Sequence, residues 1–175
     1  MNGIVLKITI VALSLPIISC GRRPQNGQEK MTPVQATEAR RAIAAYLECE
    51  ECDSGELEAL VKLGQKVAPS LAATLRDGPA PATRELYRRQ LLAAYRGLKE
   101  YEANHREAKV LMGEEKYVKT YLDNQAAYHR IRAATVLAAI GGEVARKALE
   151  QAQEAAYRDD VKLAVNAALD KLKKR

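Results

Sequence analysis

Apolar residues recur along the chain at the three- and four-residue spacing of α-helices, and no stretch alternates in the manner of a β-strand. The clearest example is a long helix after "PAPATRE", with Thr83 as its expected N-cap, in which five residues share one face. They are Tyr87, Leu91, Ala94, Leu98 and Tyr101. The pattern therefore predicts an all-α fold with no β-sheet.

Capping residues and helix breakers divide the chain into successive helices. Thr32 or Thr37 can cap a first helix, Ser54 a second, and Gly78 ends a third, which has Pro69 in its first turn. The first expected helix ends at about Glu48. The next six span about 54–64, 68–77, 80–101, 114–123, 126–140 and 143–157, and the last begins at Asp159 or Asp160. At 175 residues, the chain has room for one domain.

Parts of this helical pattern repeat. "RIRAATVLAAIGG" and "KLAVNAALDKL" align at an offset of 32 residues, and weaker copies occur at "LEALVKLG" and "RRQLLAAYRGLK". Equivalent positions 60, 95, 137 and 169 are 35, 42 and 32 residues apart, which is typical of helix-pair repeats.

Two segments carry a family resemblance. "RAATVLAAIGGEVARKALEQA" resembles a HEAT-like repeat of the lyase type, and "LVKLGQKVAPSLAATLRDG" resembles the second half of another, whereas 80–125 departs from the pattern. The resemblance implies that residues 34–175 form a short α-solenoid whose helix pairs stack because none can bury its apolar face alone. It implies an interaction scaffold, although some relatives are lyases or assembly factors for tetrapyrrole pigments. An ordinary Ala-rich helical bundle is the alternative.

The first twenty residues indicate export. Lys7 precedes an apolar run over 8–18, which is too short to cross about 30 Å of hydrocarbon but is typical of a signal peptide over 1–19. The run ends in "IISC", which resembles the lipobox of bacterial lipoproteins and implies a lipid on Cys20. A secretory signal with an incidental cysteine is the alternative.

This lipobox implies a cell-envelope protein that is anchored by lipid and faces the periplasm. Gly21 after the lipidated residue favours the outer membrane in a cell that has two. Residues 20–33 are rich in Pro, Gly and polar side chains, which predicts a flexible tether. The net charge of +6 then indicates solubility and attraction to anionic lipid, with no nucleic-acid partner expected.

The stretch "LECEECDSG" places Cys49 and Cys52 two residues apart among acidic side chains. A redox role is disfavoured, because the acids and the expected position of Cys49 at a helix C-terminus both oppose a thiolate. A zinc site would need further ligands that the sequence does not supply. We expect a local disulfide, and we keep as the alternative function a thiol-redox or metal-handling protein that uses this pair.

The remaining residues present no catalytic constellation. His105 and His129 lack a second ligand at helical spacing, and there is no HExxH, GxSxG or phosphate-binding loop. We therefore expect no enzyme, cofactor or metal, and a packing or surface role for both histidines. The leading hypothesis is a lipid-anchored scaffold that binds a protein partner through its helical repeats. Its candidate surface comprises Arg84, Arg88, Arg130, Tyr87 and Tyr128, with a structural role as the default for the arginines.

Overall fold

A computed structural model describes residues 31–49 and 54–174 of the chain. The expected signal peptide, the lipidation site Cys20, most of the tether and Cys52 lie outside these residues and stay predictions. The described residues form seven α-helices and one short 3-10 helix, without a strand, which confirms the all-α prediction. The helices are α1 (Pro33–Glu48), α2 (Ser54–Leu63), η1 (Gly64–Lys66), α3 (Ala68–Asp77), α4 (Pro81–Asn104), α5 (Glu114–Ile140), α6 (Gly142–Gln153) and α7 (Asp159–Lys173).

Local signals set several of these boundaries as expected. Thr32 is the N-cap of α1: its hydroxyl accepts a hydrogen bond from the Gln35 backbone at 3.2 Å, and the Gln35 side chain accepts one from the Thr32 backbone at 3.0 Å. Thr37, the other candidate, lies inside the helix. The chain leaves α3 at Gly78 with φ of 83°, a backbone conformation that favours glycine.

Three expected boundaries are wrong. The two helices expected at 114–123 and 126–140 are one helix, α5, because residues 123–126 contain neither glycine nor proline to interrupt it. Thr83 is not an N-cap, since α4 already begins at Pro81, whose fixed φ suits the first helical position. The helix α6 ends at Gln153 and not at residue 157.

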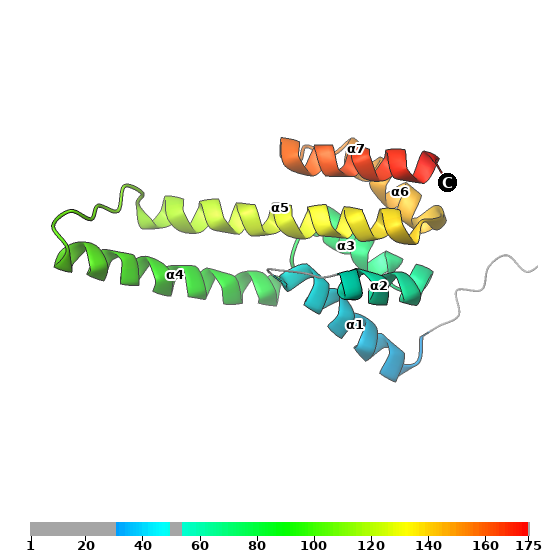
Figure 1. The fold of residues 1–175 in the computed structure, drawn as a ribbon, viewed down its shortest axis with the longest axis horizontal. Coiled ribbons are helices and arrows are strands. Elements are labelled where there is room, and N and C mark those ends of the chain that lie inside the picture. The colour runs from blue at the N-terminus through cyan, green and yellow to red at the C-terminus, as the bar shows by residue number, and fades with distance from the viewer. Residues whose placement is uncertain (1–30, 50–53, 175) are drawn as a thin grey trace, which may run out of the picture.

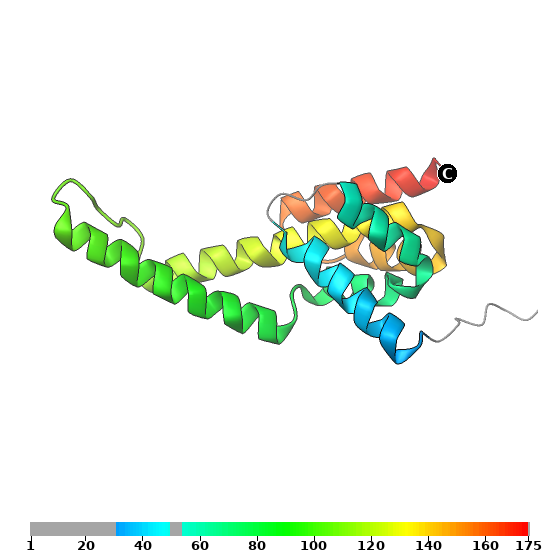
Figure 2. The ribbon, with the colours of Figure 1, turned by 60° about the horizontal axis from the view of Figure 1, so that its bottom comes forward.

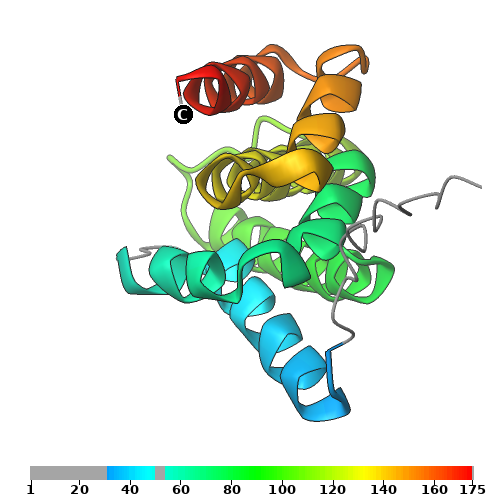
Figure 3. The ribbon, with the colours of Figure 1, turned by 90° about the vertical axis from the view of Figure 1, so that its right-hand side faces the viewer.

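The helices divide into a body and a projecting arm (Figures 1 and 2). We call α4, the loop 105–113 and the first half of α5 the arm, and the remaining helices with the second half of α5 the body. Within the body, α1, α2, α3, α6 and α7 all pack against α5, whereas α4 packs chiefly against α5 alone. Figure 3, viewed along the arm, shows the body helices surrounding α5.

The two parts have separate hydrophobic clusters. The body core extends from Ile43 in α1 to Leu169 in α7 and includes several side chains with no exposed surface. The arm has a small cluster, built by Leu91 of α4 with Val118 and Leu122 of α5. The face expected on α4 is therefore only partly buried. Tyr87 packs beside Leu91, but Leu98 and Tyr101 are 41% and 56% exposed, because a single helix covers only a narrow stripe of α4.

Candidate functional site

A groove of about 520 Å³ lies where the arm joins the body. We call it the junction groove. The C-terminal end of α1, the first half of α4 and the middle of α5 line it. The lining residues are Leu47, Glu48, Cys49, Thr83, Leu86, Tyr87, Gln90, Asn124, Gln125, Tyr128 and His129. The groove thus combines apolar side chains, amides, one imidazole and the carboxylate of Glu48.

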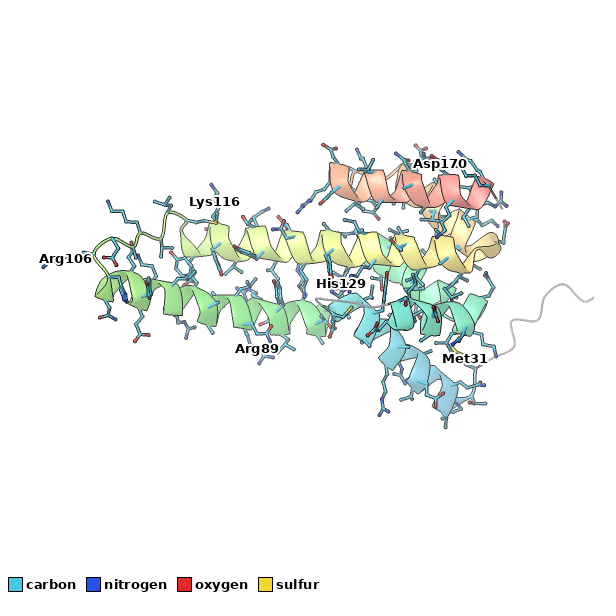
Figure 4. All side chains as sticks on the ribbon, viewed as in Figure 1. Met31, Arg89, Arg106, Lys116, His129 and Asp170 are labelled. Carbon is cyan, nitrogen blue, oxygen red and sulfur yellow. The ribbon has the colours of Figure 1, made fainter. Side chains whose placement is uncertain are left out.

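Two polar atoms in this groove are buried without a hydrogen-bond partner. His129 is only 4% exposed and its Nδ1 is unpaired, and the Oε1 of Gln125 is also buried and unpaired. Figure 4 shows His129 at the middle of α5, where the arm meets the body. The two residues are four positions apart and so share one face of the helix. Most buried polar groups in proteins are paired, and among the described residues the Oε2 of Glu56 and the Nε of Arg130 share this unpaired state outside the groove.

The imidazole of His129 favours its neutral form. Burial lowers the pKa of His129, and the positive charge of Arg132, one turn further along α5, lowers it further. A neutral imidazole carries one hydrogen-bond donor and one acceptor. The groove therefore offers hydrogen-bonding groups without a formal charge at its buried wall.

Beside the groove, Arg132 joins α5 to the C-terminal end of α1. Its guanidinium lies 4.1 Å from the ring centroid of Tyr128 and 5.2 Å from that of Tyr46. It donates a hydrogen bond to the Tyr46 carbonyl, and its Nη1 lies 2.9 Å from the Cys49 sulfur. The Tyr128 hydroxyl donates to the Cys49 carbonyl at 2.9 Å. These donors satisfy carbonyls at a helix C-terminus, whose dipole also favours a cation.

Burial also affects Tyr46, the residue of α1 that Arg132 covers. It raises the pKa of the Tyr46 phenol, and the nearby charge of Arg132 opposes this increase. Tyr46 is therefore a neutral packing residue. We call the contacts among Arg132, Tyr46, Tyr128 and Cys49 the Arg132 clamp, and they hold one wall of the junction groove in place.

The five residues of the expected binding surface do not form one surface. Tyr87 and Tyr128 line the junction groove. Arg84 and Arg88 line a different hollow of about 430 Å³ on the arm, together with acidic side chains of α5. Arg130 lies 5.0 Å from the ring centroid of Tyr157, away from both.

Arg130 instead lies against the chain that leaves α3. A Cβ added to Gly78 would stand 3.4 Å from an Arg130 nitrogen, so the guanidinium lies against this turn. The Tyr157 hydroxyl, under the same guanidinium, donates to the Arg76 carbonyl at 3.2 Å. Arg130 thus has the structural role that the sequence favoured as the default for the arginines.

Sequence reasoning missed Gln125 and Arg132 as parts of a site, and it gave His129 only a packing or surface role. The signal was present in part, since Gln125, Tyr128, His129 and Arg132 follow one another at helical spacing. However, one helix was expected to end at about residue 123 and another to begin at about residue 126. This expected break separated Gln125 from the other three residues. The position of α1 over this face is a tertiary feature that the pattern does not carry.

Cys49 is the C-cap of α1, which places its sulfur at the negative end of the helix dipole. It is disulfide-bonded. Cys52 lies outside the described residues, so the pairing of Cys49 with Cys52 stays a prediction.

Over 31–49 and 54–174, no three or more His, Cys, Asp or Glu side chains group closely enough to hold a metal ion. None of the helices described is both long and apolar enough to cross a membrane.

The comparisons with known proteins identify no relative. No family model matches the chain, and no match was found among curated proteins or solved structures. The lipoprotein and HEAT-like assignments therefore stay predictions.

Proposed function

We propose that this chain is a cell-envelope interaction module, anchored by a lipid on Cys20, that binds a protein partner through its projecting arm. The projecting arm carries this proposal. A helix of 24 residues that packs chiefly against one neighbour leaves apolar side chains in solvent. On the arm, Leu86, Leu98, Tyr101 and Leu111 are 50%, 41%, 56% and 93% exposed. Exposed apolar side chains mark interaction sites where they form a contiguous patch, and we propose that these four contribute to such a patch on the arm.

The position of the arm supports the same role. Arg106 lies in the loop at the far end of the arm, and Met31 lies at the opposite end of the molecule (Figure 4). An anchor attached before Met31 would leave the arm directed away from its attachment point. A scaffold needs this arrangement to reach a partner from the membrane.

We further propose that the body is a short HEAT-like array. In this arrangement α2 and α3, each packed on α5, supply one repeat, α5 with α6 is the next helix pair, α7 begins a third, and the arm is an extension of the second. The packing of α3 on α5 and α6, and of α7 on the same two helices, supports it. So does a contact between the two turns: the Gln65 amide after α2 donates to the Gly141 carbonyl after α5 at 2.5 Å. Repeat arrays stack their turns as well as their helices.

A site-specific photo-crosslinker tests the role of the arm. We place it at Leu111 in the full chain, expressed in its own cell envelope, and at Leu163 of α7 as the matched control. Both are exposed leucines, at 93% and 72%, but only Leu111 lies on the arm. We expect a discrete covalent adduct with one protein from position 111 and none from position 163. Equal labelling at the two positions, or no adduct at 111, would contradict the proposal.

The anchor is tested separately by Cys20→Ser. This change removes the sulfur that would carry the lipid, so the protein should move from the membrane fraction to the soluble fraction of the envelope. A variant that stays with the membrane would show that Cys20 is not the attachment point, whether or not the arm binds a partner.

A further inference from the structure

The buried wall of the junction groove points to a ligand class. We propose that the groove binds an extended segment of the partner protein, which displaces the lining enough for its backbone amide groups to pair with Gln125 and His129. The inference rests on the proposed function, since the segment belongs to the protein that the arm contacts. It adds where that segment lies and which atoms hold it.

The first argument is the pair of buried atoms without partners. The Nδ1 of His129 and the Oε1 of Gln125 have each lost water, and the described protein supplies no replacement. Such atoms carry a free-energy penalty that a ligand with suitable polar groups removes. Both side chains line a cavity of about 520 Å³, within the range of roughly 300–1,000 Å³ that is usual for ligand pockets.

The second argument is charge. Arg132 lies one turn from His129, lowers the pKa of its imidazole, and would repel a cationic ligand. An anionic ligand would meet the unpaired Gln125 oxygen and the carboxylate of Glu48 at the edge of the groove. A neutral polar ligand avoids both conflicts.

The third argument is the match between hydrogen-bonding groups. A peptide unit offers one N–H donor and one carbonyl acceptor, so it can pair with neutral His129 in either tautomer. Its neighbouring unit on the same edge can donate to the Gln125 oxygen. An oligosaccharide also offers donors and acceptors, but without this regular repeat.

The spacing is of similar size. Residues four apart on a helix, as Gln125 and His129 are, have Cβ atoms about 5–6 Å apart. In an extended chain the N–H groups that face one side occur at every second residue, which is roughly 6.7 Å at 3.2–3.4 Å per residue. Side chains of the segment would then contact Leu47 of α1 and Leu86 of α4, which supply apolar surface on the lining.

A peptide titration followed by NMR tests the inference. The full chain, ¹⁵N-labelled at histidine and glutamine and held in detergent, is titrated with the neutral peptide Ac-Ser-Leu-Ser-Leu-Ser-NH₂. A second peptide has the same sequence with alternate backbone nitrogens methylated. We expect the first peptide to shift the His129 ring and Gln125 amide signals at millimolar concentration. The methylated peptide should bind at least about tenfold more weakly, because it lacks the donors.

Variants connect the binding to the two side chains. His129→Phe and Gln125→Met remove the unpaired atoms with little change of shape, and each should weaken peptide binding by about tenfold while circular dichroism shows an intact fold. His105→Phe makes the same histidine change on the arm, outside the groove, and should leave binding unchanged.

Three results would overturn the inference: no shift at millimolar peptide, equal binding of the methylated peptide, or binding of a neutral oligosaccharide such as tri-N-acetylglucosamine in place of the peptide. An adduct from Leu111 together with any of these would retain the proposed function and refute the peptide site. Failure of both experiments would refute both.

Discussion

Replacing His129 with leucine should make the protein more stable, although His129 is one of its most buried polar residues. The side chain is 4% exposed, and its Nδ1 has no hydrogen-bond partner. The helix α5 that carries it is packed against the body helices and joined to α1 by the Arg132 clamp. Leucine has a similar bulk, no polar atom, and a better helix propensity.

The size of the gain follows from the cost of the unpaired atom. A buried polar group without a partner costs about 1–3 kcal/mol, and leucine removes this cost. Imperfect packing of the branched side chain offsets part of it, typically by less than about 1.5 kcal/mol. We expect a net increase of about 1 kcal/mol in the free energy of unfolding, which corresponds to about 2–4 °C in Tm for a chain of this size.

The same replacement should also change how stability depends on pH. Burial and Arg132 lower the pKa of His129 in the folded state, so the unfolded chain takes up the proton first as the pH falls. The wild-type protein therefore has its full stability above about pH 6.5, the pKa of an unperturbed histidine, and loses stability as the pH decreases from there toward the lowered folded-state pKa. The variant lacks this loss, so its advantage should grow at acidic pH.

Urea unfolding followed by circular dichroism, at several pH values between 5 and 8, measures both effects. His105→Leu is the control, because it replaces a histidine of the arm that stacks on Tyr101 at 3.8 Å between ring centroids and leaves the groove intact. This control should not increase stability. A His129→Leu protein that is less stable by more than about 1 kcal/mol would show that the imidazole is paired in solution, and the reasoning about the groove would then be wrong.

Three further predictions concern the clamp, the glycines and the arm. Arg132→Ala removes the hydrogen bond to the Tyr46 carbonyl and two ring contacts, and should cost about 2–3 kcal/mol in urea unfolding, whereas Arg106→Ala in the exposed loop should cost almost nothing. Gly78→Ala should destabilise the protein by about 1–3 kcal/mol, because φ at Gly78 is 83°. Gly97→Ala should stabilise it by about 0.5–1 kcal/mol, because Gly97 lies in mid-helix and an added Cβ would meet nothing within 4 Å. Equal effects of the two changes in thermal unfolding would refute this prediction. Leu91→Ala should speed hydrogen exchange in the arm and leave the body protected, and faster exchange throughout would contradict separate clusters.

The sequence predicted most of the helices because their signals are local. The Thr32 capping box, the stop at Gly78 and the apolar face of α7, where Val161 and Val165 are buried, depend only on neighbouring residues. The continuity of α5 was missed because the polar residues at 123–125 resemble a connection, and only packing on both sides shows that the helix continues. Helix propensity is a weak guide where tertiary contacts decide.

The candidate site was predictable only in part, because it depends on which helices meet. Tyr87 and Tyr128 were expected at a binding surface and do line one groove, but Arg84 and Arg88 line another. Side chains that are close in the sequence of a helix can point to different faces, so residues that cluster in the sequence can lie in different hollows. The unpaired state of His129 is likewise a property of its neighbours, and nothing in "AYHRI" specifies it.

The continuous helix α5 connects the arm mechanically to the junction groove. Its 27 residues extend over about 40 Å, from the arm through the groove to the body core. On the arm, in a chain without Phe or Trp, Tyr117 of α5 lies 5.4 Å from Tyr95 of α4 between ring centroids. Tyr121 lies 4.6 Å from Tyr117 on the same helix. The Tyr95 hydroxyl also donates to the Met112 carbonyl in the loop at 3.0 Å.

A partner that shifts α4 at the arm would therefore act on the groove directly. Leu86 and Tyr87 belong to α4 and line one wall, while Gln125 and His129 belong to α5, which the Arg132 clamp fixes to α1. One wall is thus held by the body, and the other is held on the arm by the small cluster and by the contacts of Tyr95. Because the opposing walls are secured so unequally, the width of the groove depends on the packing of α4 against α5. Contact at the arm and occupation of the groove should consequently strengthen each other when both favour the same position of α4.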